Sequence, residues 1–122
     1  MKMLLAIAPA VILMVYGQLV TKWRVHSMAA AADGSQTFLA RAMGYLLDPY
    51  VLTAYVTTFA ASVAWMFVVE RYPISTAFPI YIGLTVVMVT AGGALLLGET
   101  ITGWQVLSIV LILVGVAVGS RT

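Results

Sequence analysis

The stretch Tyr16-Gly17-Gln18-Leu19-Val20-Thr21-Lys22 closes the first long apolar run of the chain. Among the long apolar runs, this one alone ends with an amide and an ammonium group four residues apart. Residues i and i+4 of a helix lie one above the other on the same face. We therefore expect Gln18 and Lys22 to form a short polar stripe just inside one boundary of an apolar helix.

The composition places the chain in a lipid bilayer. Of its 122 residues, 63% are hydrophobic and 8% are charged, whereas soluble domains carry about 25% charged residues. Charge-free runs of about 20 residues are long enough to cross a hydrocarbon core of about 30 Å as helices. The runs are Met3–Thr21, Pro49–Val69, Tyr72–Gly98 and Thr100–Ser120. We expect an all-α polytopic membrane protein, a single domain over residues 1–122, with transmembrane helices at about 3–23, 49–70, 74–97 and 102–120.

The small numbers of cysteine, histidine and charged residues argue against disulfide-bonded, metal-binding and nucleic-acid-binding proteins. The chain has no cysteine and one histidine, so we expect no disulfide, no metal site and no cofactor. Its net charge of +2 comes from a few scattered groups, which argues against binding of nucleic acid. Lys22, Arg24 and His26 separate the first apolar run from the small residues that follow it. We therefore interpret this run as a retained helix and not as a cleaved signal peptide.

Residues 25–47 form the only sizeable polar connection. Ala29–Ala32 and Asp33–Ser35 predict a loop. The apolar residues of 38–47 recur at roughly helical spacing, which suits either a short helix on the membrane surface or extra turns leading into the next span. That span has a clear start, because Asp48 can cap it and Pro49 suits the first helical position.

Other residues have structural interpretations. Pro79 and the glycines after it make 74–97 the least regular span, able to hinge or to admit a close neighbour. Glu99 is expected near the start of the last helix, where the helix dipole favours an anion. Gly115 and Gly119 form a G-x-x-x-G pair, which favours close packing of two helices. We assign this pair to the packing of a dimer.

The basic residues are balanced across the predicted membrane. The two groups are Lys2, Arg71 and Arg121 on one side, and Lys22, Arg24 and Arg41 on the other. Cytoplasmic loops normally carry an excess of Lys and Arg that sets the orientation. With little bias, the chain can insert both ways and pair as an antiparallel homodimer. The alternative is that a homologous partner fixes the orientation in a heterodimer.

Several motifs together resemble one family. They are the G-Q-L-x-x-K element Gly17–Lys22, the stretch Tyr72–Pro79, the turn Leu97–Gln105 and the closing stretch Leu111–Val116. This set resembles the drug/metabolite transporter superfamily, and within it the short four-helix members. Those are the small multidrug resistance transporters and the small subunits of the undecaprenyl-phosphate-aminoarabinose flippase, to which the G-Q-L-x-x-K element points. The resemblance implies a small multidrug resistance-like fold, a multi-pass location in a bacterial inner membrane, and a dimer.

The chain departs from the multidrug exporters because its first apolar run contains no acidic residue. Those exporters, which the chain resembles, carry a glutamate in the first helix that exchanges protons for cationic drugs. Met3–Thr21 contains no Asp or Glu. An ammonium at Lys22 and an amide at Gln18 favour an anionic group such as phosphate. Tyr81, which follows Pro79 in the irregular span, is the best aromatic candidate for lining a cavity.

We therefore expect a transporter, without catalytic residues, that moves an anionic lipid-linked substrate held by Gln18, Lys22 and Tyr81. The resemblance implies an undecaprenyl-phosphate-linked sugar, such as an aminosugar. Two other functions stay open: a proton-coupled exporter of cations, and a non-transporting subunit that supports a glycosyltransferase. Each residue also has a simpler interpretation. Lys22 can anchor the helix at the interface, Gln18 can bridge helices, and Tyr81 can serve packing.

Overall fold

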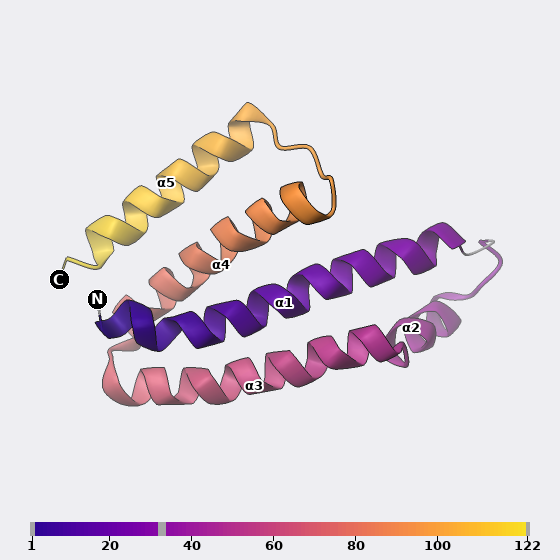
Figure 1. Cartoon of the computed structure of the whole chain (residues 1–122), viewed down its shortest axis with the longest axis horizontal. Helices are drawn as coiled ribbons and strands as arrows, with labels where there is room; N and C mark the ends of the chain where they lie inside the picture. The colour runs from indigo at the N-terminus through magenta and orange to yellow at the C-terminus, as the bar shows by residue number, and fades with distance from the viewer. Residues whose placement is uncertain (1, 32–33, 122) are drawn as a thin grey trace.

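The computed structural model describes residues 2–31 and 34–121. These residues form α1 (Lys2–Ala31), α2 (Phe38–Leu46), α3 (Pro49–Arg71), α4 (Ile74–Leu96) and α5 (Gly103–Gly119). Figure 1 shows α1 between α3 on one side and α4 on the other, with α5 returning beside α4. The start of α1 and the end of α5 lie at the same end of the molecule. Helices α4 and α5 run in opposite directions and form an antiparallel pair (Figure 1).

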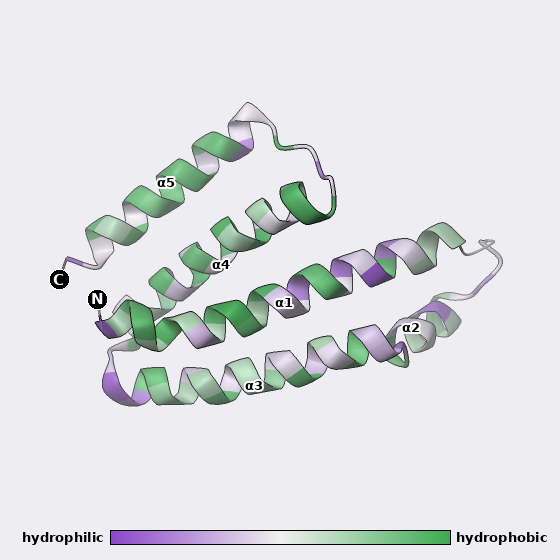
Figure 2. Cartoon of the chain, in the orientation of Figure 1, coloured by the Kyte–Doolittle hydropathy of each residue, from purple (hydrophilic) through white to green (hydrophobic). Residues whose placement is uncertain are grey.

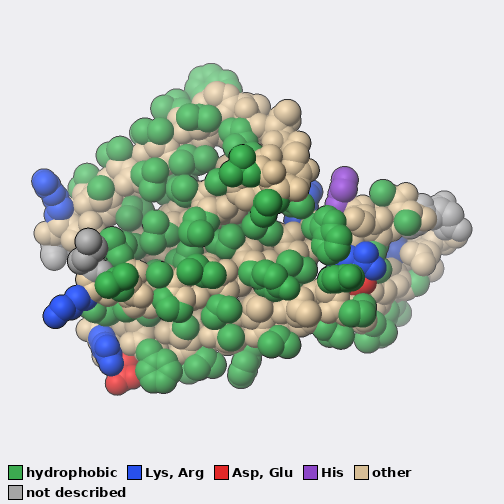
Figure 3. All heavy atoms as spheres, viewed as in Figure 1, with side chains coloured by type: hydrophobic (Ala, Val, Ile, Leu, Met, Phe, Trp, Pro, Cys, Tyr) green, Lys and Arg blue, Asp and Glu red, His purple; other side chains and the backbone are tan. Residues whose placement is uncertain are grey.

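The described residues make an all-helical membrane protein. Three helices, α1, α3 and α4, are long and apolar enough to cross a membrane. The apolar helix α5 has 17 residues, a rise of about 26 Å against a hydrocarbon core of about 30 Å. The structure thus establishes three candidate spans, and the expected fourth stays a prediction. Hydrophobic side chains are spread over the whole visible face, and Lys and Arg lie towards its two ends (Figure 3).

Helix α1 is longer than the sequence predicts. It continues through Ala31, so the expected loop at Ala29–Ala31 is wrong, while Ala32 and Asp33 lie outside the described residues. Alanine has the highest helix propensity, and a run of alanines extends a helix that has already formed. The 30 residues of α1 span about 45 Å, which exceeds the hydrocarbon core by about 15 Å. Figure 2 shows the hydrophilic residues of α1 gathered in its second half.

The connection to α3 contains a separate helix. Thr37 caps α2 by accepting a hydrogen bond from the Ala40 amide at 3.2 Å. Leu47 and Asp48 then separate α2 from α3, so α2 is not an extension of that span. The carboxylate of Asp48 accepts hydrogen bonds from the amides of Tyr50 at 3.1 Å and Val51 at 3.2 Å. The predicted cap by Asp48 is therefore confirmed.

An ion pair joins α1 to the start of α3. Nε of Arg24 donates to Oδ1 of buried Asp48 at 2.9 Å. The guanidinium of Arg24 also lies 5.0 Å from the ring centre of Tyr50 and 5.8 Å from that of Trp23. Burial opposes ionisation of Asp48, but the hydrogen bonds from Arg24, Val51 and Tyr50 outweigh it and hold the pKa below its usual value.

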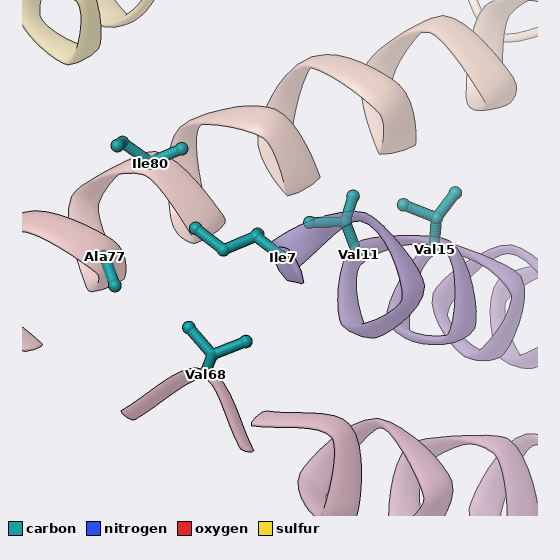
Figure 4. Packing of buried hydrophobic residues seen from close by; sticks show 6 residues of the cluster. All are labelled: Ile7, Val11, Val15, Val68, Ala77 and Ile80. Carbon is teal, nitrogen blue, oxygen red and sulfur yellow. The ribbon is translucent and has the colours of Figure 1, made fainter. Parts of the chain in front are cut away.

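The core lies where the first half of α1 meets the end of α3 and the start of α4. Three residues of α1 are spaced four apart and therefore share one helix face. Figure 4 shows them beside one residue of α3 and two of α4. The cluster consists of Ile7, Val11, Val15, Val68, Ala77 and Ile80.

Two glycines allow helices to approach closely. A Cβ at Gly17 would lie 2.9 Å from Oγ1 of Thr58 and 3.3 Å from the carbonyl oxygen of Ala54, both on α3. A Cβ at Gly83 would lie 2.5 Å from Cγ2 of Val116 on α5. Neighbouring backbones pack tightly where a side chain is missing. Within the chain, Gly83 therefore serves the contact of α4 with α5, and a Cβ at Gly115 would meet no atom within 4 Å.

A first prediction concerns Gly17. Gly17→Leu forces α1 away from α3, and overpacking of this kind costs about 1–3 kcal/mol. We expect a lower midpoint of thermal unfolding in detergent micelles than for the parent chain. Gly103→Leu is the matched control, because a Cβ at Gly103 meets no atom within 4 Å. Equal midpoints for the two variants would show that the close approach at Gly17 does not limit stability.

A second prediction concerns the pH dependence given by Asp48. A carboxylate with a lowered pKa in the folded state stabilises that state above its unfolded-state pKa, and the contribution is lost as the pH falls through the folded-state pKa. The parent should therefore lose thermal stability as the pH falls below the usual Asp value of 3.8. Asp48→Asn keeps a capping oxygen but should flatten this part of the profile. An unchanged slope in Asp48→Asn would assign the acid sensitivity to other groups.

Candidate functional site

A groove runs along α1 and α4 in the apolar part of the molecule. Its volume is about 440 Å³, and we call it the Gln18 groove. Gln18 and Tyr81, predicted from separate parts of the sequence, both line it. The complete lining is Met14, Gln18, Tyr81, Ile82, Thr85, Val86, Val89 and Thr90. Its wall is therefore mostly apolar, with one amide, one phenol and two hydroxyl side chains.

A second pocket lies at the level of Lys22, one helical turn beyond Gln18. This Lys22 pocket has a volume of about 290 Å³ and joins α1 to the connection between α4 and α5. Its lining is Lys22, Trp23, His26, Leu96, Leu97 and Glu99. The i, i+4 spacing puts Lys22 above Gln18 on one face of α1. The predicted polar stripe thus leads from the Gln18 groove to the Lys22 pocket.

Gln18 does not bridge two helices within the described residues. Its amide nitrogen donates weakly to Sδ of Met14, at 3.7 Å on the same helix. The side chain is otherwise exposed along the groove. An exposed amide keeps both donor and acceptor capacity for a ligand.

Lys22 and Glu99 share the Lys22 pocket without pairing directly. Lys22 is exposed and forms no ion pair within 4.0 Å among the described residues. The backbone amide of Glu99 donates to the carbonyl of Gly93 at 3.1 Å. A Cβ at Gly93 would lie 3.2 Å from Oε2 of Glu99, so the carboxylate rests against the end of α4.

This position differs from the one expected for Glu99. Helix α5 begins at Gly103, and Thr102 caps it in a reciprocal capping box with Gln105. Glu99 therefore precedes the cap by three residues, and its carboxylate lies against Gly93 of α4. The helix dipole acts mainly within the first turn, so the pocket beside Lys22 and not the start of α5 defines the surroundings of Glu99.

A cluster of three aromatic side chains, Trp65, Phe78 and Tyr81, adjoins the Gln18 groove. The ring centre of Trp65 lies 4.8 Å from that of Tyr81 and 6.1 Å from that of Phe78. An adjoining pocket of about 310 Å³ includes these three residues and shares Met14 and Tyr81 with the groove. Tyr81 therefore serves packing and also faces the groove.

The remaining predicted residues lie away from these pockets. Pro79 is exposed within α4, which continues through it without interruption. Gly115 and Gly119 are exposed on α5. Asp48 is held in its ion pair with Arg24. None of the four lines the Gln18 groove or the Lys22 pocket.

Sequence reasoning missed two members of the site. Glu99 and His26 line the same pocket as Lys22, although Glu99 is far from Lys22 in the sequence. The i, i+4 spacing from Lys22 to His26 was the one local signal for His26. No local pattern signals Glu99, since its position depends on how α4 packs against α1. Among the described residues, no group of three or more His, Asp or Glu side chains is arranged to hold a metal ion.

Comparison with protein-family models, with curated proteins and with solved structures finds no match to this chain. The resemblance to short drug/metabolite transporters therefore rests on the motifs of the sequence itself. Any function must be argued from the Gln18 groove, the Lys22 pocket and the membrane setting.

Proposed function

We propose that the chain is a transporter, or a transporter subunit, that moves an anionic lipid-linked sugar across a bacterial inner membrane. The observation that carries the proposal is the stripe of Gln18 and Lys22 beside an apolar groove, both exposed, with Lys22 in no ion pair among residues 2–31 and 34–121. An amide and an ammonium recognise phosphate oxygens. The family resemblance adds the undecaprenyl-phosphate-linked sugar, such as an aminosugar, as the substrate class.

The charges along the groove favour an anion over a cation. Its lining contains no acidic residue, so it offers no carboxylate to attract a cation or exchange a proton. Lys22 lies where the apolar part of α1 ends, at the depth of a lipid headgroup. A phosphate can meet Lys22 there and then Gln18 one turn deeper. The apolar wall suits the lipid chain that follows.

A second chain completes this transporter. The Gln18 groove is open, and helix α5 has no buried residue among those described. A second copy or a homologous subunit can cover α5 along the face that carries Gly115 and Gly119, where small residues permit close packing. The dimer then encloses the substrate between two grooves. The balanced basic residues suit antiparallel partners, and a heterodimer is the other arrangement.

One observation favours a second function, the proton-coupled export of cations. Glu99 lines the Lys22 pocket, so a titratable carboxylate lies near the candidate site. It shares this pocket with the Lys22 ammonium, which weakens its attraction for a cation. We therefore rank this function below the movement of an anion.

The third prediction tests the anion site. The parent and two variants, Lys22→Ala and Gln18→Ala, are reconstituted in vesicles that contain an undecaprenyl-phosphate-linked aminosugar, and translocation is measured. A hydrogen bond to a charged group contributes about 1.5–3 kcal/mol and a neutral one about 0.5–1.5 kcal/mol. We expect Lys22→Ala to lower the rate by roughly tenfold or more, and Gln18→Ala by several-fold. Lys2→Ala, at the opposite end of α1, is the matched control and should keep the parent rate.

Full activity of both variants would refute the headgroup role of the stripe. If the parent shows no translocation of any anionic lipid but is needed for a glycosyltransferase, the non-transporting subunit becomes the correct function.

A fourth prediction separates the anion and cation functions through Glu99. Glu99→Gln removes the negative charge beside Lys22, so it should preserve or increase the movement of an anionic lipid. A proton-coupled cation exporter would instead lose its proton-dependent uptake of a cationic dye in the same variant. The measurement is dye and lipid transport by one preparation, with and without a pH gradient. Dye export that Glu99→Gln abolishes would overturn the proposed function.

A further inference from the structure

The short helix α2 turns its apolar side away from the rest of the chain. Its large apolar residues fall within about half of the helix circumference at 3.6 residues per turn. They are strongly exposed: Phe38 by 88%, Leu39 by 70%, Met43 by 47% and Leu46 by 47%. Leu47, directly after the helix, is exposed by 67%. No residue of α2 is buried.

The opposite side of α2 is small and polar, and it faces the end of α1. Ala40, Arg41, Gly44 and Tyr45 line a pocket of about 300 Å³ together with Met28 near the end of α1. A Cβ at Gly44 would lie 4.0 Å from Cε of Met28. A helix that faced water would bury its apolar stripe against the protein and expose its polar side. Helix α2 leaves its apolar stripe exposed and sets its polar side beside α1, which favours an apolar medium outside.

The position of α2 identifies this medium as the boundary of the lipid bilayer. Only Leu47 and Asp48 separate it from α3, and Asp48 is paired with Arg24 beside Trp23 and Tyr50. Tryptophan, tyrosine and arginine side chains favour the membrane–water interface. Arg41, which donates to the Tyr45 hydroxyl at 3.3 Å, gives α2 the basic polar side typical of helices that lie in this layer. The exposed face of α2 thus continues the lipid-facing surface of α3.

We propose that α2 is a membrane-surface helix that inserts Phe38, Leu39, Met43 and Leu46 into the boundary between lipid headgroups and acyl chains. The partner of this surface is the lipid bilayer itself, on the side of the membrane where α1 ends. Insertion at this level places the Arg24–Asp48 pair among the headgroups and fixes the depth of α1. It also leaves the last turns of α1 outside the hydrocarbon core. The inference does not depend on the proposed transport function.

The absence of native cysteines permits a direct test by single spin labels. Phe38→Cys, Met43→Cys and Leu46→Cys report the outer side of α2, and Ala40→Cys and Gly44→Cys report the side towards α1. Each labelled full chain is reconstituted in vesicles of phosphatidylethanolamine and phosphatidylglycerol. Collision with oxygen, which concentrates in lipid, is compared with collision with a water-soluble nickel chelate. Met66→Cys, exposed on the span α3, is the lipid-facing reference.

We expect the outer labels to collide with oxygen more often than with nickel, with a ratio approaching that of Met66→Cys. The labels on the α1 side should show a clearly lower ratio. Frequent collision of the outer labels with nickel would place α2 in water and overturn the proposal. Protection of the outer labels from both reagents would overturn it as well, because a second copy of the chain would then cover α2. Three independent outer positions keep the test decisive if one variant does not fold.

Discussion

The close contact of α1 with α3 determines how the rest of the molecule is arranged. Gly17 lets the two backbones approach in the middle, and the Arg24–Asp48 pair joins them at one end. With one side of α1 occupied by α3, its remaining surface is available to α4. Gln18 and Lys22 lie along that surface, facing pockets shared with α4 and its following connection. The polar stripe is therefore a consequence of helix packing as well as of sequence spacing.

Features that depend on neighbouring residues were predictable from the sequence. Asp48 with Pro49 marks the start of α3 through local hydrogen bonds, and the last helix begins close to the predicted residue 102. The end of α1 was predicted too early because the end of the apolar run marks a membrane boundary, which differs from the end of the helix at Ala31. Alanine-rich residues beyond the interface keep the helical conformation. Helix length also decides the number of candidate membrane spans: α1, α3 and α4 are long and apolar enough to cross a membrane, and the apolar helix α5 is shorter.

Features that depend on contacts between distant residues were not predictable. The G-x-x-x-G pair of Gly115 and Gly119 predicts close packing of α5 in a dimer. Within the chain, however, the close contact of α5 is made by Gly83 of α4 against Val116. A glycine pair shows where close packing is allowed, and only the helix arrangement decides where it occurs. The position of Glu99 also depends on the helix arrangement. Glu99 follows α4, and it lines the Lys22 pocket because α4 packs beside α1. The i, i+4 spacing of Gln18 and Lys22 indicates that they share one face of a helix. It gives no sign that Glu99 lies in the same pocket as Lys22.

Asp48 is buried and Glu99 is exposed, and these two acids have different electrostatic roles. Asp48 is neutralised by Arg24 and by the amides that start α3, so it adds little field to the neighbouring pocket. Glu99 remains beside Lys22 without a direct ion pair. It lowers the positive potential at the pocket mouth, while the Gln18 groove below contains no charge of either sign. The Lys22 pocket thus combines an ammonium with a nearby carboxylate, and the adjoining Gln18 groove is lined by uncharged residues.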